Sequence, residues 1–172
     1  MKNIILLFLL LPTMMACNKK ENNKEYFYFD ANGVHYNYPL KTKLGLLGES
    51  KSIWAGASSG SLGYFMGASC WKDPSAPGTI TFNFPGNNIP TQDTIILDGV
   101  NNRSTIERFL NQEAYYKLVP PQNGRIIFTE RTTQRLTGTF QFDVKLVVTP
   151  TQGTVDSVIH ITNGKFSIIP AQ

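Results

Sequence analysis

The stretch TFQFDVKLVV, residues 139–148, decides the fold class. Apolar residues occupy every second position, and the polar residues Thr139, Gln141, Asp143 and Lys145 fill the positions between them. Because successive side chains of a β-strand point to opposite faces, this alternation predicts a strand with one buried and one wet face. The predicted core positions are Phe140, Phe142, Val144, Leu146 and Val148.

Further strands are predicted on both sides of this stretch. Residues 125–130 (RIIFTE) precede it across a connection short enough for a hairpin, and residues 155–161 (VDSVIHI) follow a Pro/Gly break. The three runs together predict an antiparallel meander. In the tail VIHITNGKFSII, Asn163-Gly164 fits either a tight turn or a β-bulge, since both residue types tolerate a positive φ.

The N-terminal half also has β character, and Asn32-Gly33 is its strongest hairpin signal. One helical turn is predicted at residues 104–110, where Ser104 and Glu107 form a capping-box pattern. Short strands without a βαβ rhythm predict an all-β fold, an antiparallel β-sandwich of roughly 8–10 strands, with a calycin-like β-barrel as the alternative. The β-rich runs cover residues 26–30, 34–38, 53–58, 63–71, 79–84 and 94–97.

The N-terminus carries a targeting signal. Lys2 precedes an apolar block at residues 4–11, which is shorter than the roughly 20 apolar residues of a membrane span and therefore indicates a secretory signal. The block leads into MMAC, which resembles the lipobox of bacterial lipoproteins. The resemblance implies cleavage after Ala16 and acyl chains on Cys17, and two or more such chains anchor a protein stably. The alternative is a soluble secreted protein in which this cysteine is incidental.

The segment after Cys17 predicts a flexible stalk, because NKKENNKE at residues 18–25 contains no large apolar side chain. Its KKE resembles a partial form of the export signal of surface lipoproteins in Bacteroidetes-type bacteria. We therefore expect a signal peptide at 1–16, a lipidated cysteine and stalk at 17–25, and one β domain at 26–170. The expected location is the outer membrane, with surface exposure favoured over the periplasmic face.

Three motifs together resemble a family of small Bacteroidetes-type lipoproteins with a β-rich domain of unknown function. They are ANG within residues 27–38, GTFQF at 138–142 and TNGKF at 162–166. The resemblance implies a lipid-anchored, sandwich-like domain and supplies no catalytic residue. From the residues themselves, Gly138 and Gly164 are expected at bends or close approaches. Phe140, Phe142 and Phe166 are expected in the core.

Catalytic chemistry finds little support in the sequence. His35 and His160 are the two histidines, and each is opposite in parity to its apolar neighbours, so both are predicted to face solvent. Neither lies in a nucleophile motif, and no His/Cys spacing suits zinc. We predict a non-enzymatic protein with no catalytic residue, metal or cofactor. With Cys17 lipidated, Cys70 has no disulfide partner and is predicted to be buried.

Aromatic residues are the remaining candidates for function, because tyrosine and tryptophan can stack on sugar rings. Strand aromatics also commonly pack in cores, so both roles stay open. The candidate ligand-binding residues are Trp54, Trp71, Tyr64, Tyr115 and Tyr116. Two triplets beginning at Asp93 and Asp156 resemble O-glycosylation acceptors, which would place Thr94 and Ser157 on the surface.

These observations predict a tethered binding or structural accessory protein. Its expected partners are the membrane, through the lipid on Cys17, and a glycan or another envelope protein. A formal net charge of +4 is too small to indicate nucleic acid. The alternatives are a glycan-binding lipoprotein for nutrient capture and an inhibitor or hydrolase whose site is assembled from loops.

Overall fold

The computed structural model describes residues 24–43, 49–57, 63–69, 78–99, 101–108, 114–118, 124–147 and 158–171. The regular secondary structure of these residues consists of β-strands. Within the same ranges, no helix is long and apolar enough to span a membrane. The strands are β1 (Tyr26–Ala31), β2 (Val34–Asn37), β3 (Lys41–Lys43), β4 (Glu49–Lys51), β5 (Ile53–Ala57), β6 (Tyr64–Ser69), β7 (Thr79–Phe84), β8 (Thr94–Leu97), β9 (Arg103–Arg108), β10 (Ala114–Leu118), β11 (Gly124–Arg131), β12 (Leu136–Val147) and β13 (Val158–Ile168).

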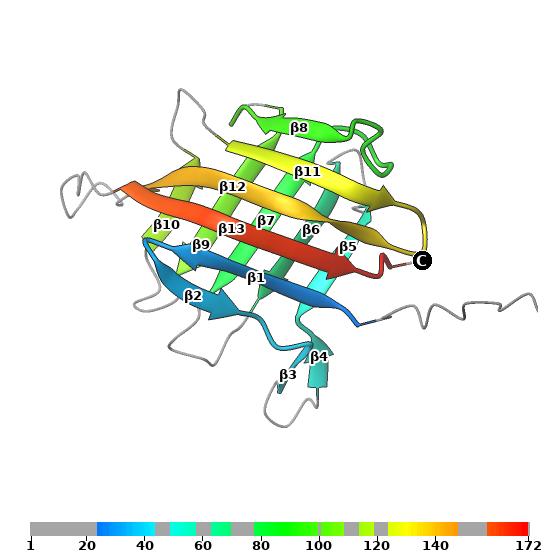
Figure 1. Ribbon diagram of the computed structural model, residues 1–172, viewed down its shortest axis with the longest axis horizontal. Helices are drawn as coiled ribbons and strands as arrows, with labels where there is room; N and C mark the ends of the chain where they lie inside the picture. The colour runs from blue at the N-terminus through cyan, green and yellow to red at the C-terminus, as the bar shows by residue number, and fades with distance from the viewer. Residues whose placement is uncertain are drawn as a thin grey trace, which may run out of the picture.

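Eleven strands form two antiparallel layers packed face to face, and β3 and β4 pair in a separate two-stranded sheet (Figure 1). The front sheet runs β2-β1-β13-β12-β11-β8, and the back sheet runs β10-β9-β7-β6-β5. Strand β12 belongs to both, because its first half pairs with β11 and its last residues pair with β10. The described strands do not close into a barrel, so the predicted sandwich is confirmed and the barrel alternative is wrong. The front and back sheets together contain 11 strands, more than the 8–10 predicted.

The predicted meander is confirmed by β11, β12 and β13, which pair antiparallel in chain order. Within β12 the predicted alternation holds, since Phe140, Phe142 and Val144 are buried. The helical turn predicted at residues 104–110 is wrong, because β9 occupies Arg103–Arg108. Strand β9 pairs with β7 on one side and β10 on the other, so sheet pairing outweighs the local capping-box preference.

The core between the two sheets is rich in phenylalanine. The ring of Phe140 in the front sheet lies 5.2 Å from that of Phe27 and 5.1 Å from that of Phe82 in the back sheet, measured between centroids. Tilted and edge-on pairs at such distances add roughly 0.5–1.5 kcal/mol each beyond area burial. The fully buried phenylalanines are Phe27, Phe29, Phe82, Phe84, Phe142 and Phe166.

Two glycines of the central strand pair accommodate core rings on the neighbouring strand. Gly138 of β12 is paired with Phe166 of β13, and Gly164 of β13 is paired with Phe140 of β12. A Cβ at Gly138 would lie 2.7 Å from the Phe166 ring, and one at Gly164 would lie 2.5 Å from the Phe140 ring. The two Gly-x-Phe motifs are therefore reciprocal, and the predicted close approaches are confirmed.

Asn163 forms a β-bulge rather than a turn. Its φ is 53°, and β13 continues through it. The pairing of β13 shifts by one residue at this point against both β12 and β1. A bulge inserts one extra residue and thereby re-aims the side chains beside it.

Polar contacts of Glu25 with Lys51 and Ile169, which we call the latch, join the two ends of the domain. The carboxylate of Glu25 accepts a hydrogen bond from the Ile169 amide at 2.7 Å and pairs with Lys51 at the same distance. The Ala171 amide also donates to the Ala55 carbonyl, at 2.8 Å. Glu25, just before β1, therefore lies beside the C-terminal end of the domain, at one end of the front sheet (Figure 1).

Candidate functional site

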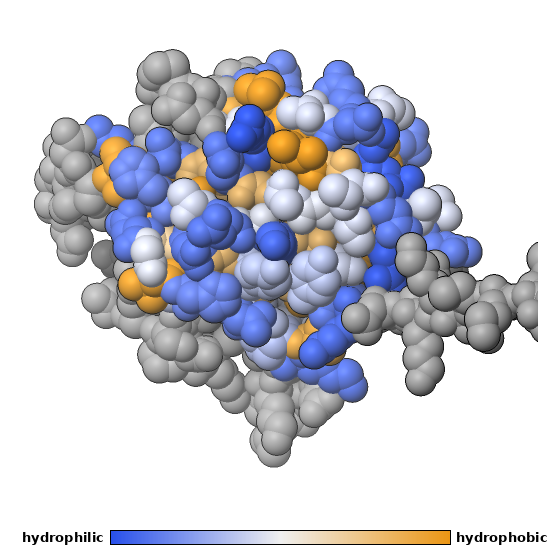
Figure 2. Space-filling model, viewed as in Figure 1, coloured by the Kyte–Doolittle hydropathy of each residue, from blue (hydrophilic) through white to orange (hydrophobic). Residues whose placement is uncertain are grey.

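The candidate site is the outer face of the front sheet, which Figure 2 shows as a mixture of hydrophilic and intermediate side chains with scattered hydrophobic ones. Alternation along β12 sends Thr139, Gln141 and Asp143 outward because their neighbours fill the core. The same rule places Tyr26 and Tyr28 outward between the buried residues of β1.

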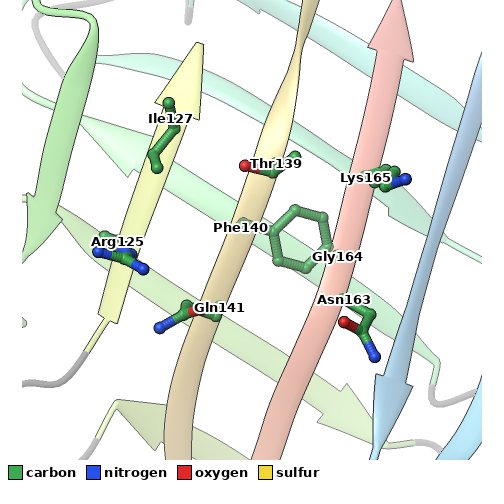
Figure 3. A pocket seen from close by; sticks show the side chains of 8 residues that line it. All are labelled: Arg125, Ile127, Thr139, Phe140, Gln141, Asn163, Gly164 and Lys165. Carbon is green, nitrogen blue, oxygen red and sulfur yellow. The ribbon is translucent and has the colours of Figure 1, made fainter.

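A shallow depression of about 200 Å³ lies at the centre of this face, around the bulge (Figure 3). Arg125 and Ile127 reach it from β11, and Lys165 reaches it from β13. The side chains of Thr139 and Gln141 stand between these strands. We call it the central depression, and its lining residues are Arg125, Ile127, Thr139, Phe140, Gln141, Asn163, Gly164 and Lys165.

The charge inside the central depression is positive. Arg125 and Lys165 are both exposed, and neither forms an ion pair or hydrogen bond with another described residue. No carboxylate lines the depression. It therefore presents two uncompensated cations on either side of uncharged hydroxyl and amide groups.

A second hollow, the tyrosine groove, borders the front sheet near the start of β1. It has a volume of about 540 Å³. The Tyr26 and Tyr28 rings lie 5.7 Å apart within it. Tyr28 is paired with Lys165 of the central depression, so the two hollows adjoin across β1 and β13. The groove is lined by Lys24, Glu25, Tyr26, Tyr28, Asn37, Tyr38, Pro39 and Leu40.

Two histidine–aspartate pairs occupy the end of the front sheet away from the latch. His35 Nδ1 lies 2.7 Å from Asp30 Oδ1, and His160 Nδ1 lies 2.8 Å from Asp143 Oδ1. The Asn163 side chain also donates to Asp30 Oδ2 at 2.8 Å. A hydrogen bond from Asn163, and to a smaller extent one from His35, holds the pKa of Asp30 below its ordinary value of 3.8.

Both histidines are exposed, as predicted, with 61% and 63% of their side chains accessible. Each could accept a proton through Nε2 while its aspartate orients the ring, and such a pair supplies two of the three members of a hydrolytic triad. No hydroxyl or thiol among the described residues is hydrogen-bonded to either ring. No three metal-ligating side chains gather in these parts of the chain.

Of the predicted aromatic residues, the two whose side chains the structure describes, Trp54 and Tyr64, do not line this site. The Tyr64 ring is buried with 4% exposure, so in this structure it presents no face on which a sugar could stack. Its hydroxyl has no partner within the described residues, and burial raises the pKa of Tyr64 to about 12. Trp54 is half-buried on the back sheet, where its ring lies over Gly67.

The other predicted positions lie in β10, in β8 or outside the described residues. Tyr115 and Tyr116 lie in β10, but their side chains are outside the described set. Thr94 is exposed, as a modified residue would have to be. Cys17, Cys70, Trp71 and Ser157 lie outside the described residues.

The residues that do line the site had weak sequence signals. The alternation YFYFD already sets Tyr26 and Tyr28 opposite in parity to two core phenylalanines. Arg125 and Lys165 lie 40 positions apart in the sequence numbering and come together only because β12 pairs with both of their strands. The alternation of apolar and polar residues along β1 could have predicted the outward position of the tyrosines. The proximity of Arg125 and Lys165 depends on strand pairing, which the alternation does not predict.

Comparisons with protein-family models, with curated proteins and with solved structures find no match. The resemblance to small Bacteroidetes-type lipoproteins therefore stays a prediction.

Proposed function

We propose that the protein is a lipid-anchored, non-enzymatic binding protein of the outer membrane that holds a polysaccharide on the outer face of its front sheet. The observation that carries the proposal is the continuity of the central depression with the tyrosine groove through the Tyr28–Lys165 pair. Together they offer aromatic faces, hydroxyls and amides along one open surface.

The chemistry of the surface suits a sugar chain. Tyrosine rings provide flat apolar faces for the C–H side of a sugar ring, while their hydroxyls and the Asn37 amide can hydrogen-bond its polar edge. Both hollows are open rather than enclosed, which suits an extended chain more than a small molecule buried on most sides.

The proposed location of the protein rests on the N-terminal sequence. Lipid on Cys17 would hold the domain at the membrane through the stalk, which joins the domain at Glu25. The outer face of the front sheet would then be presented beside the tether. Polysaccharide capture for nutrition is the role that this arrangement would serve, with surface display favoured over the periplasmic face.

The test is binding of polysaccharides to the full-length protein in detergent micelles, measured by calorimetry against a panel of neutral and acidic polymers. We expect Tyr28→Ala to weaken binding by about tenfold, since it removes one stacking ring. Tyr28→Phe keeps the ring and should retain most of the affinity. Trp54→Ala, on the back sheet, is the control for loss of an aromatic side chain elsewhere. Absence of binding across the panel, or equal losses in Tyr28→Ala and Trp54→Ala, would refute the proposal.

A hydrolase is the second candidate, and the two histidine–aspartate pairs are the observation that favours it. The same bound polymers would be incubated and examined for new reducing ends. Product formation that is lost in His35→Ala or His160→Ala would replace the non-enzymatic role with a catalytic one. Polymers recovered at their original length support the binding role.

A further inference from the structure

We infer that the polysaccharide is acidic, with carboxylate or sulfate groups repeated along its chain, and that Arg125 and Lys165 are the residues that select it. This inference rests on the proposed function and specifies its ligand. The observation that carries it is the placement of two uncompensated cations on either side of one shallow hollow (Figure 3).

The two cations are spaced for separate anionic groups. Arg125 is paired with Gln141 and Lys165 with Thr139, so one strand, β12, separates them. Neighbouring strands lie about 4.8 Å apart, which places the two backbones roughly 10 Å apart across the sheet. A polymer with anions at intervals can meet both cations at once. The Arg125 guanidinium is suited to a planar, bidentate partner, and the Lys165 ammonium acts as a point charge.

The groups between the cations are suited to sugar hydroxyls. Thr139 and Gln141 stand there without charge, and Asn163 directs its amide nitrogen to Asp30, leaving its carbonyl oxygen free to accept a hydrogen bond from the ligand. A chain of this kind could continue past Lys165 onto the Tyr28 ring, which is the neighbouring residue across the strand pair.

Two nearby carboxylates of the front sheet, those of Asp30 and Asp143, already have partners. Asp30 accepts hydrogen bonds from Asn163 and is paired with His35, and Asp143 is paired with His160. Neither of these carboxylates lines the central depression, where Arg125 and Lys165 set the local charge. The local charge balance therefore favours an acidic ligand even though the whole chain is only weakly basic.

The experiment compares three probes on the full-length protein in detergent micelles: a polyuronate, a sulfated glucan and the same glucan without sulfate. We expect the acidic polymers to bind more tightly than the neutral glucan, and raising the salt from about 20 mM to about 200 mM to weaken only the acidic ones. The better acidic probe identifies carboxylate or sulfate as the preferred group. Glucuronate alone should bind at least tenfold more weakly than the polyuronate.

The variants Arg125→Gln and Lys165→Gln should each weaken acidic binding by about tenfold, with little effect on the neutral glucan. Lys41→Gln removes the same charge from β3, outside the front sheet, and is the matched control. If only neutral glucan binds, or if both variants behave like Lys41→Gln, the charge inference is wrong while the proposed function stands. If no polysaccharide binds, both are wrong. Equal affinity for glucuronate and polyuronate would overturn the extended site.

Discussion

Gly138 and Gly164 show how single residues specify the central strand pair. Each is matched with a phenylalanine on the opposite strand, and each leaves room that the ring fills. The two rings lie in the core beside the β12–β13 pairing that carries the central depression on its other face. The same two strands therefore determine the packing of the core on the inner face of the sheet and the position of the polar side chains on its outer face.

Substitution of either glycine tests this packing. Gly138→Ala or Gly164→Ala should lower the free energy of unfolding by about 2–3 kcal/mol, because the new methyl group would overlap a core ring and a backbone carbonyl. Gly56→Ala is the matched control, since its Cβ would lie 3.6 Å from Ala171, an ordinary contact. Guanidinium denaturation measures all three. Equal stability of Gly138→Ala and Gly56→Ala would contradict the reciprocal packing.

The carboxylate of Asp30 should make stability depend on acid pH. Its pKa is lowered in the folded chain by Asn163 and His35, so the ionised form is favoured by folding. This contribution is complete above the unfolded value of about 4, and it is lost as the pH falls through the lowered folded pKa. Urea denaturation from about pH 6 to about pH 2 should show a shallower pH dependence for Asp30→Asn than for the parent chain. An unchanged pH dependence would show that Asp30 has no stabilising role.

At the scale of elements, the bulge in β13 links the core to the surface. Without its extra residue, the alternation of β13 would place one half of the strand with its core residues facing solvent. Asn163 takes the positive φ that the bulge needs, and its side chain holds Asp30 of β1. One residue therefore sets both the register of the strand and a boundary of the central depression.

Two substitutions separate the backbone role of Asn163 from its side-chain role. Asn163→Val should cost about 1–2 kcal/mol or more in unfolding free energy, because a β-branched residue is disfavoured at a φ of 53°. Asn163→Gly keeps this conformation accessible and loses only the hydrogen bond to Asp30, so its cost should be smaller. Thermal or guanidinium unfolding ranks the two variants. A valine variant as stable as the glycine variant would contradict the bulge.

Strands β12 and β9 show when a local sequence pattern predicts the structure and when strand pairing outweighs it. Period-two alternation predicts β12 because burial on one face is a property of that strand's own residues. The capping-box pattern at Ser104 predicts a helical turn, yet these residues pair with strands on both sides. Two rows of backbone hydrogen bonds, one to each neighbouring strand, outweigh a cap that contributes about 1 kcal/mol.

At the scale of the whole molecule, the latch at Glu25 fixes the start of the described domain beside its C-terminal end. Glu25 lines the tyrosine groove at the start of β1, and the histidine–aspartate pairs lie at the other end of the front sheet. A tethered chain would therefore carry the proposed binding surface alongside its point of attachment.

Replacement of the lipid acceptor tests the tether. Cys17→Ser should abolish metabolic labelling with a fatty acid and release the protein from the membrane fraction, since no thiol remains for the acyl linkage. The Cys70→Ser variant is the control and should label normally. Protease treatment of whole cells then reports display, and complete resistance would favour the periplasmic face. Continued labelling of Cys17→Ser would contradict the lipobox interpretation.

The sequence by itself determined the all-β class, the meander of the last three strands and the outward position of both histidines. These follow from the alternation of neighbouring residues, which is local. Only the tertiary structure decided that β12 joins two sheets, that Asn163 makes a bulge, and that Arg125, Lys165 and Tyr28 share one surface. Those outcomes depend on which strands pair and in what register, and pairing between distant segments is not encoded in the period of either segment alone.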